Sequence, residues 1–185
     1  GRPLYPLLCI LDRTIAQLES LGTSRWVGFS FVWFALLKIV QRDAEGAVQA
    51  LRQFYHAFLS PNGFHLNGDF RKTGLSEFQY RPFTLEASCL SVQAVNEMLL
   101  YSQNGEIEIF PVIPADWRTC AFRGLRVENG LIVSAELTAT GCVTLRLHAK
   151  RAGSWYLKNT NQTLRLEQGE RRICRWTIKP DIQDP

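Results

Sequence analysis

The chain has 185 residues, of which 46% are hydrophobic and 21% are charged, and its formal net charge is +4. This composition is typical of a soluble globular protein with one large or two modest domains, and it excludes a mainly disordered chain. The basic residues are scattered or form short pairs such as Arg171-Arg172. Nucleic acid is therefore not an expected partner.

Five cysteines occur without a C-x-x-C pair and without paired histidines. This pattern indicates neither a zinc site nor a complete disulfide framework, and we expect no metal and no cofactor. Unpaired thiols favour a reducing, cytoplasmic compartment and leave secretion open. The most apolar run, residues 27–40, is shorter than the roughly 20 residues that cross a bilayer and contains Lys38. No membrane association is expected.

Helical periodicity dominates the first half of the chain. Apolar residues spaced three and four apart predict a helix over residues 4–18, which Gly22 ends. The apolar run 27–40 predicts a helix that is enclosed on most sides. A one-sided helix is predicted after Asp43, a suitable N-cap, and another helix over residues 85–101. One-sided helices alternating with enclosed ones are typical of stacked helical hairpins.

A long segment, "SPNGFHLNGDFRKTGLSEFQYRPF" (60–83), separates the last two of these helices. Loops of this length inside compact domains are usually functional or disordered, and the five aromatic residues of this one predict order.

After Asn104-Gly105 the periodicity becomes alternating. The stretches "EIEIFPVIP" and "CVTLRLHAK" predict strands, and "GLRVENGLIVSAEL" predicts a hairpin about Asn129-Gly130. Three further short strands are predicted towards the C-terminus. The predicted fold class is thus α+β and multidomain, with helical hairpins over residues 1–104 and an antiparallel β-sandwich over residues 105–185.

One stretch, "LEASCLSVQAVNEMLLYSQNGEIEIFPVIPADW", resembles glycoside hydrolase family 95, the inverting α-L-fucosidases and related α-galactosidases. The family has an acidic residue opening a helix, then an "EMLLQS" segment, a Gly, a strand and a "P-x-(L/I)-P-x-x-W" turn. The corresponding residues here are Glu86-Ala87-Ser88, 97–102, Gly105, 107–110 and 111–117. A weaker match relates "GFSFVW" and "QRDAEGAV" to the family's "GWS-x-x-W" and "R-x-G-D-G-x-x-A", so the resemblance covers about residues 20–137.

The resemblance implies the last helices of an α/α toroid followed by a β-sandwich, that is, the C-terminal portion of a glycosidase. The first residues, Gly-Arg-Pro, and a single methionine at position 98 also suggest a piece of a longer polypeptide. In the family, the catalytic acid and the Asn residues that hold the attacking water lie upstream. The expected partners are therefore a carbohydrate and the upstream part of the protein, in the same polypeptide or in a separate chain, and this chain alone is expected to be inactive.

Glu86 stands where the family keeps the Asp on the base side of the reaction. An inverting glycosidase needs a carboxylate that activates water, and a helix start favours the ionised form. A second interpretation is that Glu86 only stabilises the helix start, with Thr84 as N-cap. The family's "D-G-N-F-G" is here "EASCL", which places Ser88 where an Asn is expected. A changed substrate, or a non-catalytic glycan-binding or structural module, therefore stays open beside the enzyme.

Several other polar and aromatic residues are candidates for binding the sugar. They share a place in the loop 60–83 or in the motif-bearing helices: His65, Asn67, Asp69, Tyr80, Arg81, Trp33 and Ser88. His65, Asn67 and Asp69 alternate and would share one side of an extended segment. The alternative is that residues 67–69 form a turn, that His65 is an interior group and that Trp33 belongs to the core.

Overall fold

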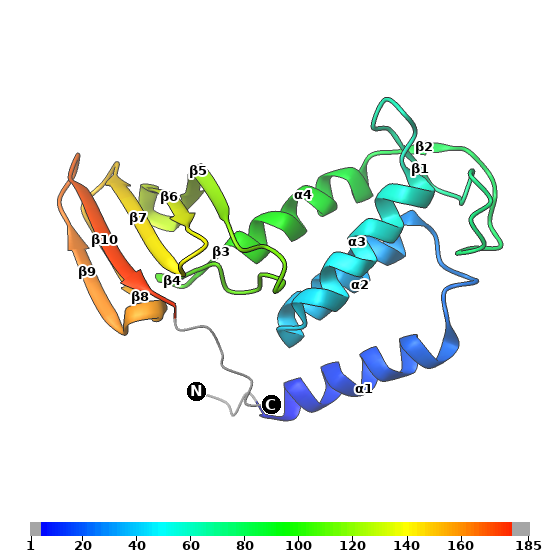
Figure 1. The fold of residues 1–185 in the computed structure, drawn as a ribbon, viewed down its shortest axis with the longest axis horizontal. Helices are drawn as coiled ribbons and strands as arrows, with labels where there is room; N and C mark the ends of the chain where they lie inside the picture. Colours follow the sequence, from blue (N-terminus) through cyan, green and yellow to red (C-terminus); the bar gives the residue numbers. More distant parts are fainter. Residues whose placement is uncertain (1–4, 179–185) are drawn as a thin grey trace. The chain divides into compact units, whose positions relative to one another are not determined.

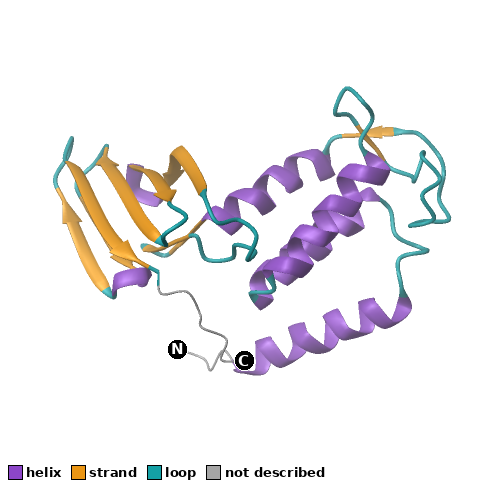
Figure 2. Ribbon diagram, viewed as in Figure 1, coloured by secondary structure: helices purple, strands orange, loops and turns teal. Residues whose placement is uncertain are grey.

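The protein is of the α+β class and divides into two compact units, Gly1–Met98 and Leu99–Pro185 (Figure 1). The structure, a computed structural model, describes residues 5–178, with side chains from residue 8 onwards. Figure 2 shows the long helices of the first unit and the strands that make up most of the second. The first residue of the helix predicted over residues 4–18 therefore lies outside the described residues. Each unit is described by itself below.

The described part of the first unit holds α1 (Tyr5–Leu21), α2 (Gly28–Gln41), α3 (Ala44–Phe58) and α4 (Glu86–Leu99). These helices confirm the positions indicated by the apolar periodicity. Asp43 is the N-cap of α3, as predicted, because its side chain accepts a hydrogen bond from the backbone N–H of the third helical residue at 2.8 Å.

The core of the first unit lies between α2 and α3. Phe31 of α2 and Phe58 of α3 are fully buried with their ring centroids 5.1 Å apart. The prediction that α2 is enclosed on most sides holds for only part of its surface. Phe29, Trp33 and Val40, spaced by four and seven residues along one face, are 37%, 40% and 61% exposed. Trp33 is therefore not a core residue, because the neighbouring helices cover the other faces of α2.

The second unit consists mainly of two four-stranded sheets. Their orders are β10-β7-β6-β5 and β3-β4-β8-β9. The strands are β3 (Leu100–Gln103), β4 (Glu106–Ile109), β5 (Cys120–Val127), β6 (Leu131–Leu137), β7 (Cys142–Ala149), β8 (Gly153–Leu157), β9 (Gln162–Leu166) and β10 (Arg171–Thr177). The pairing is antiparallel except between β4 and β8, which run parallel. Two parallel strands need a long connection between them. Here the connection from β4 to β8 contains β5, β6 and β7, which belong to the other sheet.

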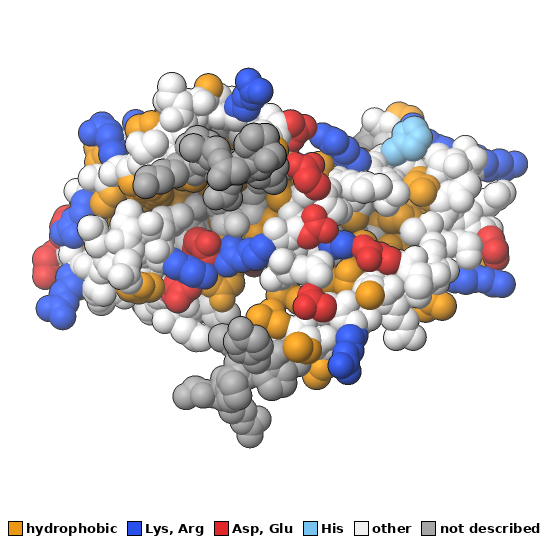
Figure 3. All heavy atoms as spheres, turned by 60° about the horizontal axis from the view of Figure 1, so that its bottom comes forward, with side chains coloured by type: hydrophobic (Ala, Val, Ile, Leu, Met, Phe, Trp, Pro, Cys, Tyr) orange, Lys and Arg blue, Asp and Glu red, His pale blue; other side chains and the backbone are white. Residues whose placement is uncertain are grey.

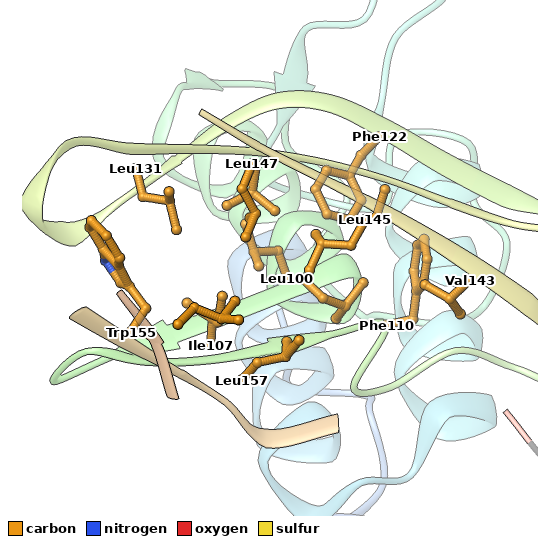
Figure 4. Packing of buried hydrophobic residues seen from close by; sticks show 14 of the residues in the cluster. Leu100, Ile107, Phe110, Phe122, Leu131, Val143, Leu145, Leu147, Trp155 and Leu157 are labelled. Carbon is orange, nitrogen blue, oxygen red and sulfur yellow. The ribbon is translucent and has the colours of Figure 1, made fainter. Parts of the chain in front are cut away.

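Alternate residues of both sheets form one shared core. Figure 4 shows Trp155 and Ile107 of one sheet and Leu131 and Leu147 of the other, with side chains directed into the same layer. Trp155 is 1% exposed, and its indole N–H donates to the Glu128 carbonyl at 3.2 Å. Large apolar side chains that are removed from water in this way stabilise the unit by about 1.5 to 3 kcal/mol each.

Charged side chains of both signs lie on the surface. Figure 3 shows Asp and Glu side chains interspersed with Lys and Arg on the face it draws. Within residues 5–178, none of the helices has the length and apolar character needed to cross a membrane.

Candidate active site

A two-residue ladder connects the loop 60–83 to the start of α4. β1 (His65–Leu66) and β2 (Phe83–Thr84) pair antiparallel, with His65 opposite Thr84. Glu86, the first residue of α4, follows Thr84 by two positions. The ladder thus fixes the backbone from which the candidate base projects.

Leu85, not Thr84, is the cap position of α4. The backbone N–H of Cys89 donates to the Leu85 carbonyl at 3.1 Å, which is the first bond of the helix. The Thr84 hydroxyl instead lies 2.6 Å from Nδ1 of His65. The expectation that Thr84 caps the helix is therefore wrong, because the hydroxyl serves the ladder.

His65, opposite Thr84 in the ladder, is completely buried. Its ring meets Phe54 edge-on at 5.2 Å, and its Nε2 has no hydrogen-bond partner among the described residues. Burial lowers the pKa of His65, and the Glu86 carboxylate acts in the opposite direction without overcoming it. The imidazole is therefore neutral near pH 7.

The hydrogen-bond pattern also assigns the tautomer of His65. A proton on Nε2 would leave a buried N–H without an acceptor, which proteins rarely tolerate. A proton on Nδ1 lets the ring donate to the Thr84 hydroxyl and leaves Nε2 as a bare acceptor. We therefore assign the proton to Nδ1. Gly28, at the start of α2, lies against the bare nitrogen: a Cβ at this position would be 2.2 Å from Nε2.

Glu86 is exposed, at the positive end of α4. The unpaired N–H groups of a first helical turn attract an anionic oxygen. Two exposed aromatic rings meet near this strand pair, one from Phe83 on β2 and one from Phe64, the residue before β1. Phe83 is 51% exposed, and its ring meets that of Phe64, 52% exposed, at 4.9 Å. A carboxylate with access to water can activate a water molecule.

Asn67 and Tyr80 are brought together on the same loop. The Asn67 side-chain amide donates to the Tyr80 hydroxyl at 3.4 Å. The backbone of Asn67 donates to the Pro82 carbonyl at 3.1 Å and accepts from the Gly28 N–H at 3.1 Å. These bonds extend the ladder and tie it to the start of α2. The amide and the phenol form a polar pair that is accessible to a ligand, since Tyr80 is 44% exposed.

Asp69 is fully buried and serves its own loop. Its carboxylate accepts bonds from the Thr73 N–H and hydroxyl at 3.0 and 2.9 Å and from the Gly74 N–H at 3.0 Å. Burial alone would raise the pKa of Asp69, but these bonds outweigh it and leave the pKa below its ordinary value. His65, Asn67 and Asp69 thus do not place three side chains on one ligand-facing side, and the alternative of a turn describes Asp69 better.

The remaining candidates are more dispersed. The Arg81 guanidinium lies 5.9 Å from the Phe70 ring centroid, on the same loop. Ser88 is half-buried in the first turn of α4, where its carbonyl accepts from the Ser91 hydroxyl at 2.8 Å. Trp33 lies on the open face of α2. It is five residues, or about 8 Å along the helix axis, from Gly28, whose N–H bonds to Asn67 beside the ladder.

A groove that sequence reasoning missed runs over α2 between α1 and α3. Its volume is about 390 Å³. On its floor the Lys38 ammonium is bound by Glu19 of α1 at 2.6 Å and by Asp43 of α3 at 3.1 Å. Burial alone would lower the pKa of Lys38, but its two carboxylate partners raise it above the ordinary value. The sequence feature that could have predicted these ion pairs is a lysine inside an apolar helix, with an acid in the preceding helix and another at the cap of the following one.

No protein-family model matches the sequence, and no curated protein matches it.

Proposed function

We propose that this chain is the C-terminal part of an inverting glycoside hydrolase that resembles family 95, built from the last helices of an α/α toroid and a β-sandwich. The observation that carries the proposal is the position of Glu86. Its carboxylate is exposed on the first turn of α4, two residues after Thr84, whose hydroxyl lies 2.6 Å from Nδ1 of His65.

In the proposed reaction Glu86 is on the base side. It removes a proton from the water that attacks the anomeric carbon, while a carboxylic acid about 6.5 to 9.5 Å away protonates the leaving oxygen. That acid comes from outside this chain, so the chain alone is inactive. The neutral His65 does not compete with the water as a donor to the carboxylate, because its single N–H is assigned to the bond with the Thr84 hydroxyl.

The substrate in this proposal is an α-linked deoxy or neutral sugar. The C–H faces of such a ring can lie on Phe64 and Phe83, and the Asn67 amide and the Tyr80 hydroxyl can bind its hydroxyl groups. Arg81, Trp33 and Ser88 remain secondary candidates. We assign Asp69 and His65 to holding the loop, because both are fully buried.

The alternative proposal is a non-catalytic glycan-binding or interaction module derived from such an enzyme. It is favoured by the open face of α2, where Phe29, Trp33 and Val40 are exposed. Exposed apolar side chains on one helix face are typical of surfaces that pack against another polypeptide.

The test compares Glu86→Gln with Glu45→Gln in the protein that supplies the rest of the site. Glu45 is also an exposed acid in a first helical turn, that of α3, so its variant reproduces the change at a helix start. Aryl α-fucosides and α-galactosides are the substrates. We expect Glu86→Gln to lower kcat by about 10² to 10⁴, with product of inverted configuration from the parent enzyme. Parent-like turnover by Glu86→Gln sinks the assignment, and glycan binding without any hydrolysis by the parent selects the alternative.

A further inference from the structure

The sheet β10-β7-β6-β5 has one face in the core and one face open. Along β10, Arg172, Cys174 and Trp176 are half-buried, whereas Arg171 and Arg175 are exposed. The other three strands alternate in the same way, as expected for a sheet with one covered face.

The strand register assembles basic side chains on this open face. Arg171 lies opposite His148, His148 opposite Ile132, and Ile132 opposite Arg126, so these four residues form one row across all four strands. Because neighbouring strands are about 4.8 Å apart, the two arginines at the ends of the row are separated by about 14 Å.

Two further rows continue the basic surface. Arg146 lies opposite Ile173, and Arg175 lies opposite Thr144. Arg171 and Arg175 are four residues apart on one strand, which corresponds to about 13 Å. The arginines thus cover an area of comparable width in both directions.

Acidic groups on the four strands do not balance these arginines. Among the core-averted positions of the four strands Glu136 is the one acid, and it reaches Arg146 only at 4.0 Å. Burial and the nearby Lys150 and Arg171 lower the pKa of His148, which is consistent with a positive potential at this end of the sheet. The face therefore favours an anionic partner.

The side chains on this face narrow the kind of anion. The outward positions of the four strands carry Ile, Thr, Ser and Ala beside the charged residues, and no Phe, Tyr or Trp on which nucleic-acid bases would stack. A four-stranded face is also wider than the two-stranded ribbon that the major groove of DNA admits. Guanidinium groups bind carboxylates and sulfates through two parallel hydrogen bonds.

We propose that the open face of this sheet, formed by Arg126, Arg146, Arg171 and Arg175, binds an anionic polysaccharide through its sulfate or carboxylate groups. The inference does not depend on a catalytic role for Glu86, because the two sites belong to different units. The sheet would hold the protein on an acidic glycan whether or not the first unit hydrolyses a sugar.

The experiment measures binding of the full chain to three carbohydrates at about 50 mM salt, a concentration at which charge contacts are weakly screened. Heparin provides sulfate groups, polygalacturonate provides carboxylates, and dextran is the neutral reference. We expect saturable binding to one or both acidic polymers, lost as salt rises, and none to dextran. An oligonucleotide and vesicles containing phosphatidylserine are the competing polyanions, and tighter binding to either of these overturns the proposal.

Charge reversal locates the binding face. Arg171→Glu and Arg175→Glu are each expected to weaken binding about five- to tenfold, because each replaces an attraction by a repulsion. Arg165→Glu is the matched control: it makes the same change in net charge at an exposed position of β9, in the other sheet, and is expected to change binding less than about twofold. Equal effects of all three variants, or no binding by the parent chain, refute the proposal. Neither result bears on the hydrolysis assay of Glu86→Gln.

Discussion

Any side chain at position 28 is predicted to destabilise the fold, because His65 occupies the space where a Cβ on Gly28 would lie. A Cβ at position 28 would lie 2.2 Å from Nε2 and 2.9 Å from Cδ2 of His65, and 3.1 Å from Cβ of Phe58. The first distance is about 1.3 Å shorter than an ordinary non-bonded contact. The imidazole cannot swing aside, since it is fully buried and held by Thr84 and Phe54.

The cost of Gly28→Ala follows from these contacts. Overpacking of this kind costs about 1 to 3 kcal/mol, and a shift that breaks the His65–Thr84 bond costs about another 1 kcal/mol. The better helix propensity of Ala returns at most about 1 kcal/mol. We therefore expect the free energy of unfolding to fall by about 1 to 3 kcal/mol, and the urea midpoint by roughly 1 M.

The assay is urea unfolding followed by far-ultraviolet circular dichroism, because the α-helices of the described residues lie within 5–99 and so report on the first unit. Gly28→Ala, His65→Ala and the double variant form a double-mutant cycle. Removing the imidazole makes room for the new methyl group, so the double variant should be more stable than the sum of the single effects by at least about 1 kcal/mol. An unchanged midpoint for Gly28→Ala, or strictly additive effects, refutes the proposed contact.

Three other predictions follow from buried groups. The pKa of His65 is lowered in the folded chain, so the unfolded state binds more protons below about pH 6.5. The free energy of unfolding should therefore fall as the pH decreases, by up to about 1.4 kcal/mol per pH unit. In urea unfolding measured across this pH range, His65→Gln should lack this loss and retain only the carboxylate-linked loss below about pH 4. Asp69→Asn places an amide against the N–H groups of Thr73 and Gly74 and should lower the free energy of unfolding by about 2 kcal/mol. A urea midpoint equal to that of the parent would mean that the bonds to the Asp69 carboxylate do not stabilise the fold. Burial raises the pKa of Cys120 to about 11, so about one Cys120 thiol in a thousand is ionised at pH 8. Mass spectrometry after brief alkylation should therefore find the exposed Cys89 modified before Cys120. Equal labelling of the two cysteines would contradict the burial of the Cys120 thiol.

The helices were predictable because their signals are local. The three-and-four spacing of apolar residues and the Asp43 cap lie within the segments that they define. The C-terminal end of α4 was predicted too far along the chain. The helix stops at Leu99 because Leu100–Gln103 pair with Glu106–Ile109 as strands β3 and β4, a tertiary contact that the helical spacing does not reveal.

The ladder under Glu86 was not predictable from the sequence. β1 and β2 have two residues each, too few to show an alternating pattern, and 16 positions separate the end of one from the start of the other. The pairing of His65 with Thr84 therefore has no sequence signature. Trp33 illustrates the converse problem, since an apolar helix indicates burial but not which of its faces stays open.

The buried contacts also show how the start of α2 sets the position of Glu86. The Gly28 N–H donates to the Asn67 carbonyl, and the Gly28 Cα lies against the imidazole of His65. His65 in turn bonds to Thr84, two residues before Glu86. A displacement at Gly28 must therefore move either the ladder or the helix start. The imidazole nitrogen that faces Gly28 is buried without a hydrogen-bond partner, which costs stability. Variants of Gly28 should accordingly disturb any activity of Glu86 in proportion to how far they displace His65, even though Gly28 itself offers no side chain to a substrate.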